Sequence, residues 1–134
     1  MNYVYLATPY SHPDSGVREF RFVESCATAA KLMNIGFPVV SPIAHSHPIA
    51  AYLDPELTLD FDFWMRQDLP LLSKASALFV LTTDGYEESR GVTRERAFAI
   101  DAKIPTIFLE YEFDPVTLKE DWNNYYAERT KIIL

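Results

Sequence analysis

ALFVLTTDGYEESRGVTRERAFA, residues 77–99, combines the patterns of a strand, a polar loop and the start of a helix. The apolar run 77–81 is bounded by polar turn residues, which predicts a strand buried on both faces. A polar loop with Gly85 follows, and after Gly91 the pattern turns helical, with four apolar candidates: Val92, Ala97, Phe98 and Ile100. Open parallel sheets bind ligands in the crevice that such a strand, loop and helix form.

The end of this loop carries groups that suit an anion. Ser89, Arg90 and Gly91 offer a hydroxyl, a guanidinium and a backbone open to close approach, beside the free N–H groups of a helix start. Glu95 falls in the first or second turn, where the helix dipole favours the ionised carboxylate. Glu95 is therefore a candidate nucleophile, although glutamate is also common near helix starts for capping reasons alone.

Composition restricts the classes of protein to consider. A chain of 134 residues predicts one domain over 1–134, and 49% apolar with 14% aromatic residues is typical of a globular protein. The net charge of -7 argues against binding DNA or RNA, which needs a basic surface. One nucleotide held by one or two arginines remains compatible with that charge.

Cysteine usage and hydropathy indicate the compartment. Cys26 is the one cysteine, so no internal disulfide can form, and we expect it to be a small buried residue of a helix. No apolar run approaches the ~20 residues of a membrane span, and no signal-peptide pattern opens the chain. These features predict a cytoplasmic protein.

The first 40 residues predict a strand, a helix and a second strand. The strand covers 3–7, and the helix runs from Ser15 to Asn34 after a cap at Asp14 or Ser15. Gly36 suits the helix end, and Pro38 indicates that strand 37–40 lies at a sheet edge or that Pro38 is the first residue of the strand. We expect the helix to bury an apolar stripe at helical spacing: Val17, Phe20, Val23, Ala27, Ala30 and Met33.

The rest of the chain continues the alternation. Residues 41–59 read as a crevice loop with a short helical turn, followed by a helix over 60–74 that kinks or restarts near Asp68 because of Pro70. A strand over 106–109 and a helix over 115–128 follow, and 130–134 is a candidate fifth strand. The alternation predicts a three-layer α/β fold with a four- or five-stranded parallel sheet.

The order of several short motifs resembles the nucleoside 2-deoxyribosyltransferase-like family, which includes deoxynucleoside monophosphate N-glycosidases. The motifs are Tyr5-Leu6-Ala7-Thr8-Pro9, then Asp68-Leu69, then Ser89 to Glu95 before Ala97, and then Lys103-Ile104-Pro105. The resemblance spans residues 3–110. The first loop departs from it, because Thr8-Pro9-Tyr10-Ser11 replaces the glycine-rich turn of many relatives.

The resemblance implies a flavodoxin-like, or Rossmann-like, fold and cleavage or transfer at the N-glycosidic bond of a nucleoside or its 5′-monophosphate. It implies that Glu95 is the nucleophile, that Asp68 assists it and that Tyr5 orients it. Ser89 and Gly91 correspond to positions that hold a 5′-phosphate, and a homo-oligomer is implied as well. No cofactor or metal is expected, and glycosidic chemistry itself calls for two such carboxyl groups.

Several other residues are candidates for the substrate pocket. Thr8, Ser11 and Arg90 belong to the crevice loops, as does His45. For His45, lining the pocket is favoured over metal binding with His47, and an exposed or turn-stabilising histidine is the remaining alternative. Trp64 and Phe63 can stack on a base, but their spacing favours core packing. Arg18 and Arg21 can reach a phosphate, although such residues most often form a solvated face.

Three functions stay open at this point. The first is the glycosidic enzyme, the second a non-catalytic nucleotide-binding or sensing domain, and the third a phosphoribohydrolase of ribonucleotides. The fold alone does not separate them, because such sheets carry many chemistries. Loss of base release on replacing Glu95 would distinguish the glycosidic enzyme from a binding domain. A comparison of ribo- with deoxynucleotides would distinguish it from the phosphoribohydrolase.

Overall fold

A parallel sheet of four strands forms the centre of the computed structural model, which describes the backbone of residues 1–133 and the side chains of residues 1–125. The strands are β1 (Val4–Ala7), β2 (Val39–Val40), β3 (Ala77–Leu81) and β4 (Thr106–Leu109). Their order is β2-β1-β3-β4, with Tyr5 of β1 between Val40 and Leu78. This confirms the predicted parallel α/β fold, with β2 at an edge.

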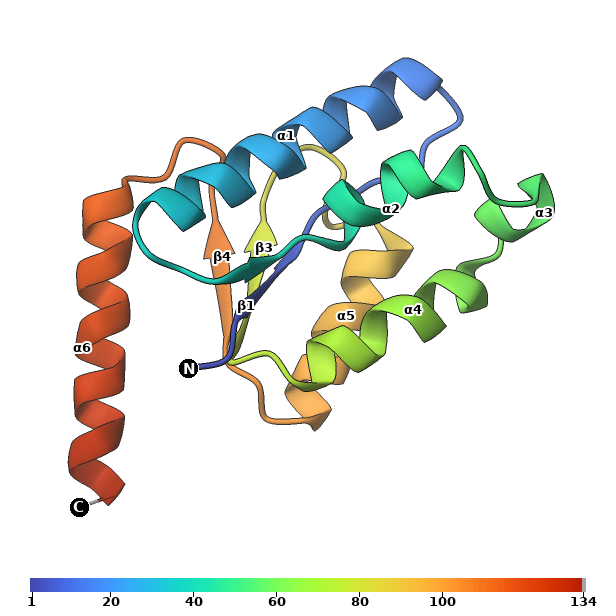
Figure 1. Ribbon diagram of the computed structural model, residues 1–134. Coiled ribbons are helices and arrows are strands. Elements are labelled where there is room, and N and C mark those ends of the chain that lie inside the picture. The colour runs from blue at the N-terminus through green and yellow to red at the C-terminus, as the bar shows by residue number, and fades with distance from the viewer. Residues whose placement is uncertain (134) are drawn as a thin grey trace.

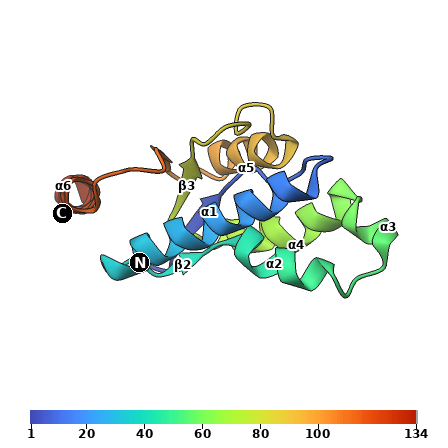
Figure 2. The same cartoon turned by 90° about the horizontal axis from the view of Figure 1, so that it is seen from above.

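Helices pack on both faces of this sheet (Figures 1 and 2). They are α1 (Ser15–Asn34), α2 (Pro42–Ala50), α3 (Pro55–Thr58), α4 (Phe61–Ser73), α5 (Arg90–Asp101) and α6 (Pro115–Ile133). Helices α1 and α6 supply buried residues to one face, and α4 and α5 supply those of the other. Figure 1 shows α6 beside β4, at the far end of the sheet from α2 and α3.

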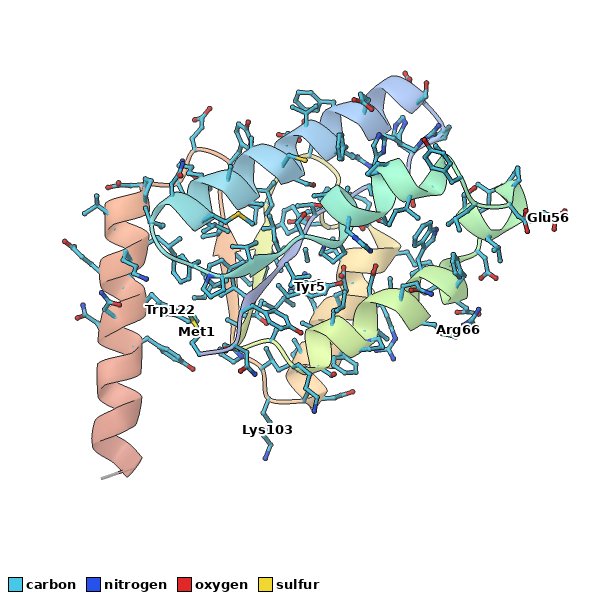
Figure 3. The ribbon with its side chains drawn as sticks, viewed as in Figure 1. Met1, Tyr5, Glu56, Arg66, Lys103 and Trp122 are labelled. Carbon is cyan, nitrogen blue, oxygen red and sulfur yellow. The ribbon has the colours of Figure 1, made fainter. Side chains whose placement is uncertain are left out.

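The strands alternate between two separate cores, as the pleat requires. On the α1 and α6 side, Phe79 packs edge-to-face against Phe37 and Trp122, with ring centroids 5.4 and 5.6 Å away. Figure 3 shows Trp122 between α6 and the sheet. The α4 and α5 side contains Tyr5 with smaller residues, among them Ala7, Leu72, Leu78, Val80, Val92 and Ala99.

Three predictions about elements are wrong. Residues 42–50 form a helix instead of a loop, because Ser41 caps it through the Ala44 N–H and Pro42 occupies the first helical position, where proline is well tolerated. Helix α4 is continuous through Pro70, so of the predicted kink or restart near Asp68 the restart does not occur. Helix α6 extends to Ile133, which excludes the fifth strand over 130–133, and residue 134 lies outside the described residues.

The predicted apolar face of α1 is wrong as well. Phe20, Val23 and Met33 are half or more exposed, and the buried face consists of Glu24, Ser25, Thr28, Ala29 and Leu32. Cys26 lies off that face and is exposed instead of buried. In α5, Ala97 and Ile100 are exposed, whereas Val92 and Ala99 are buried. Both helices bury polar side chains, so the apolar residues at helical spacing do not mark the buried face.

Within the described part of the chain, no helix has the length and apolar character needed to cross a membrane.

Candidate active site

A cavity of about 1040 Å³ opens at the carboxyl ends of β1 and β3. In the order β2-β1-β3-β4 the chain reverses direction across the sheet between β1 and β3, and α/β sheets bind ligands at such a switch point. Residues 6–8 at the end of β1, the loops before α1 and α5, and parts of α1, α2, α4 and α5 line it. The predicted crevice is thus a cavity of the size that small ligands occupy.

Asp68 and Glu95, from α4 and α5, form the floor of this cavity, and Tyr5 of β1 lies behind it, outside the lining. The Tyr5 hydroxyl donates a hydrogen bond to Oε2 of Glu95. Tyr5 is fully buried on β1, and Figure 3 shows it between the sheet and α4 and α5. Glu95 on α5 is 5% exposed and Asp68 on α4 is 9% exposed. The structure therefore brings together the three residues for which the sequence predicts catalytic roles.

Burial gives both carboxyl groups a high proton affinity. It raises the pKa of Glu95 to about 8, an effect that the Tyr5 hydrogen bond opposes and the charge of Asp68 reinforces. It also raises the pKa of Asp68 to about 6. Burial likewise raises the pKa of Tyr5, so its hydroxyl keeps the proton that it donates.

These shifts correct the expectation that Glu95 stays ionised in the free protein. Helix α5 begins at Arg90, so Glu95 lies in the second turn, where the influence of the helix dipole has largely faded. The cost of removing the Glu95 carboxylate from water therefore raises its pKa by more than the helix dipole and the Tyr5 hydrogen bond lower it. At neutral pH these raised pKa values keep one proton on the pair of carboxyl groups.

The start of α5 forms a second part of the cavity wall, and the predicted residues Ser89, Arg90 and Gly91 all line it. Ser89 caps the helix by accepting from the Val92 N–H at 3.2 Å. The Arg90 guanidinium lies 3.9 Å from the ring centroid of Phe61, which also lines the cavity. This contact keeps a positive charge at the cavity while leaving the edge of the guanidinium open.

The sequence prediction for the two histidines is partly wrong. His47 lines the cavity, whereas His45 is exposed and does not, because residues two apart on a helix face different directions. Nδ1 of His47 lies 2.6 Å from the Tyr10 hydroxyl, and Nε2 lies 2.8 Å from Oε2 of Glu19. Periodicity could not find this contact, since 41–50 was not recognised as a helix.

Aromatic and apolar side chains from α4 complete the wall. Trp64, Phe61 and Met65 line the cavity instead of the core, which corrects the preference for core packing. The Trp64 Nε1–H donates to the Thr58 carbonyl at 3.1 Å, and this bond fixes the indole. Phe63 is outside the lining but packs against Trp64, with ring centroids 4.9 Å apart.

The loop after β1 supplies the remaining predicted residues. Thr8 and Ser11 both line the cavity, and the Thr8 hydroxyl is 2.8 Å from that of Ser25. Arg18 lines the cavity too and donates to the carbonyls of His12 and Pro13. Arg21 lies outside the lining and donates to the carbonyls of Ser11 and Asp84. Among the described residues no group of three potential metal ligands occurs.

Comparison with protein families matches residues 2–111 to DUF1937, a domain of unknown function. The chain belongs to this family. The match covers every strand and the whole cavity lining, and it ends before α6. The region of this DUF1937 protein that matches the family therefore contains all the residues that line the site. A search of curated proteins gives no match.

Proposed function

We propose that this DUF1937 protein cleaves or transfers at the N-glycosidic bond of a nucleoside or deoxynucleoside, or of its 5′-monophosphate, with Glu95 as the nucleophile. The observation that carries the proposal is the buried pair of carboxyl groups, Glu95 and Asp68, with Tyr5 bound to Glu95, on the floor of a nucleotide-sized cavity. The motif resemblance to deoxyribosyltransferase-like enzymes places the same three residues at the reaction centre.

Glycosidic cleavage suits two carboxyl groups that share one proton. One carboxylate attacks the anomeric carbon as positive charge develops on the sugar, and the other group protonates the leaving base. With pKa values of about 8 and about 6, Glu95 and Asp68 hold one proton between them over this range of pH.

The reaction requires Glu95 to be the ionised member of the pair. A sugar that develops positive charge beside Glu95 favours its ionised form, because an opposite charge lowers a carboxyl pKa. The proton then resides on Asp68, from which it passes to the leaving base. Tyr5 stabilises the carboxylate through its hydrogen bond and fixes its orientation, so we assign Tyr5 a positioning role.

The phosphate of a nucleotide is proposed to lie at the start of α5. There the Arg90 and Gly91 N–H groups precede the first intrahelical bonds, and the Arg90 guanidinium adds positive charge. Gly91 is close to Glu95, since an added Cβ would lie 4.0 Å from Oε1. A phosphate bound here would place its sugar near the carboxyl pair.

The test is base release from a panel of nucleosides and 5′-monophosphates in the ribo and deoxy series, with and without a second free base, followed by chromatography. We expect release by the native protein and a loss of at least about 10³-fold in Glu95→Gln, since removal of a covalent nucleophile costs that much or more. Glu56→Gln, on the exposed helix α3, is the matched control and should keep full activity.

The panel separates the other two functions. Nucleotide binding without base release from any substrate would contradict the enzyme and support a binding or sensing domain. Release restricted to ribonucleotides would support the phosphoribohydrolase. Exchange of one base for another would identify a transferase, and release to water a hydrolase.

A homo-oligomer, implied by the resemblance, is part of the proposal. Helix α1 exposes Phe20, Val23 and Met33 along one face, an apolar surface that a second copy could cover. Light scattering after gel filtration measures the mass directly, and a mass of one chain at micromolar concentration would contradict the expectation.

A further inference from the structure

A chain of three hydrogen-bonded side chains lines the cavity beside α1 and α2. The Tyr10 hydroxyl lies 2.6 Å from Nδ1 of His47, whose Nε2 lies 2.8 Å from Oε2 of Glu19. The Phe22 ring stacks on the imidazole, with centroids 4.2 Å apart and planes 22° apart. Tyr10, His47 and Glu19 all belong to the cavity lining, but the proposed reaction uses none of them.

The chemistry of these three groups sets the direction of the hydrogen bonds. A carboxylate only accepts, so Nε2 of His47 carries the proton that it shares with Glu19. In the neutral imidazole Nδ1 is then the acceptor, and it takes the only proton of Tyr10. Burial raises the pKa of the Tyr10 phenol and outweighs the opposing effect of Arg18, so that proton stays on Tyr10.

We propose that Tyr10, held by His47 and Glu19, is a specificity residue that accepts a hydrogen bond from the exocyclic amino group of a nucleobase. The inference rests on the proposed function and names the bases that it selects. With its proton committed to His47, the Tyr10 hydroxyl only accepts hydrogen bonds. One of its two lone pairs faces Arg18, and we assign the other to the cavity. An amino group donates to that oxygen, whereas a carbonyl at the same place of the base meets a second acceptor.

The same argument places the base, and not the phosphate, next to Tyr10. An oxygen that can only accept repels a phosphate, which presents acceptors alone. The N–H groups at the start of α5 and Arg90 supply the donors that a phosphate needs, whereas the Arg18 guanidinium next to Tyr10 donates to the carbonyls of His12 and Pro13. The carboxyl pair on the floor belongs to the same cavity, as the sugar between base and phosphate requires.

The test compares bases that differ by an amino or a carbonyl group at one carbon. The binding constants of adenine against hypoxanthine nucleotides, and of cytosine against uracil nucleotides, are measured by calorimetry with the inactive Glu95→Gln protein. The measurements are made at a pH of about 8.5. We expect the amino member of each pair to bind about tenfold more tightly, the effect of one hydrogen bond gained against one acceptor left unpaired.

Three further substitutions separate this role from a structural one. Tyr10→Phe removes the acceptor and should bring the ratio to about one. His47→Phe keeps a ring to stack on Phe22 but frees the Tyr10 proton, so the hydroxyl can serve either base and the ratio should again fall to about one.

Glu19→Lys gives the sharpest result. Glu19 is exposed, so a lysine fits at this position, and it would donate to Nε2 and move the imidazole proton to Nδ1. Tyr10 would then accept from His47 and donate into the cavity, which should reverse the preference in favour of the carbonyl bases. A defect in folding would weaken both members of a pair and leave their ratio unchanged.

Equal binding of both members by the parent protein, an unchanged ratio in Tyr10→Phe, or no binding of any nucleotide would each overturn the inference. Base release without discrimination would overturn it while the proposed function stands. Discrimination in binding with no base release by the native protein would support the subsite and contradict the enzyme.

Discussion

The two faces of the sheet use the same strands for different purposes. On the face under α1 and α6, Phe37, Phe79 and Trp122 meet edge-to-face and fill the space between the layers. On the face under α4 and α5, smaller side chains surround Tyr5, and Asp68 and Glu95 of these two helices line the cavity at the carboxyl ends of the strands. One face is closed by aromatic packing, and the other keeps an opening whose polar floor raises the free energy of the folded state.

This comparison shows how a single layer of strands separates stability from chemistry. Because neighbouring residues of a strand point to opposite faces, Leu6 supports the aromatic core while Tyr5 binds Glu95. Substitutions on the two faces should therefore affect different measurements.

The largest expected effect is on the aromatic face. Phe79→Ala removes a fully buried ring and should lower the free energy of unfolding by about 3–5 kcal/mol. Phe20→Ala is the matched control, since Phe20 is 62% exposed on α1, and it should change stability by less than about 0.5 kcal/mol. Urea denaturation measures both. Equal losses would mean that α1 buries the face predicted from its periodicity.

On the cavity face, the buried carboxyl groups should lower the free energy of unfolding instead of raising it. Glu95 binds its proton more tightly in the folded protein, with a pKa of about 8, than in the unfolded chain, where the value is 4.5. Raising the pH from about 4.5 to about 8 therefore removes stability, because folding then requires a buried charge or a bound proton. Asp68, whose pKa is raised to about 6, acts in the same direction at lower pH.

Glu95→Gln removes the contribution of that charge. The variant should gain on the order of 1–3 kcal/mol relative to the native protein between pH 5 and pH 8. Urea titrations of both proteins at several pH values give the difference. A difference that stays constant with pH would mean that Glu95 titrates in the folded protein as it does in the unfolded chain.

The pH profile of catalysis sharpens the role of Tyr5. The singly protonated carboxyl pair predicts a bell-shaped kcat/KM with limbs near pH 6 and pH 8. Tyr5→Phe removes a hydrogen bond that lowers the pKa of Glu95, so the alkaline limb should move to higher pH. The maximum should fall roughly tenfold, because less Glu95 is ionised when Asp68 is protonated.

Tyr3→Phe is the control for this change, since the Tyr3 hydroxyl donates to the Leu71 carbonyl and not to a carboxyl group. A Tyr5→Phe profile with unshifted limbs would contradict the positioning role of Tyr5.

The smallest effect is expected at Gly91. An alanine Cβ would lie 3.8 Å from Cε of Met65 and 3.9 Å from Oγ of Ser89, which are ordinary contacts, so the variant should fold. Its methyl group would cover the N–H groups proposed to hold the phosphate, and affinity for a 5′-monophosphate should fall a few-fold. Affinity for the matching nucleoside should change less. Equal losses of affinity for both ligands would contradict the proposed position of the phosphate.

The sequence predicted the elements that carry strong local signals. The bounds of α1 and β4 match their predictions, since proline, glycine or capping residues flank them. Helix α2 is not predicted although Ser41 and Pro42 form a cap followed by a favoured first residue, because residues 41–59 show no apolar pattern of helical period. With α2 missed, the contact between His47 and Glu19 could not be foreseen.

The site was predicted in part, and the limit has a physical cause. The order of the motifs, through the family that it resembles, groups Tyr5, Asp68 and Glu95, and the structure brings these three residues together. The protonation of Glu95 depends on how deeply its carboxyl group is buried, and the degree of burial cannot be read from a pattern of residue types. Ser25 and Thr28 face inward on α1 for similar reasons of packing, so a search for an apolar stripe chose the wrong face.

Arg21 has a consequence for how the cavity opens. Its guanidinium donates to the Ser11 carbonyl in the loop after β1 and to the Asp84 carbonyl in the loop after β3. Gly85, at a φ of 93°, leaves the space that this guanidinium occupies, and a Cβ there would collide with it. Arg21 therefore links the two loops through its hydrogen bonds. The loops should fluctuate and exchange their amide hydrogens as one cooperative unit, so a ligand that orders one of them orders both.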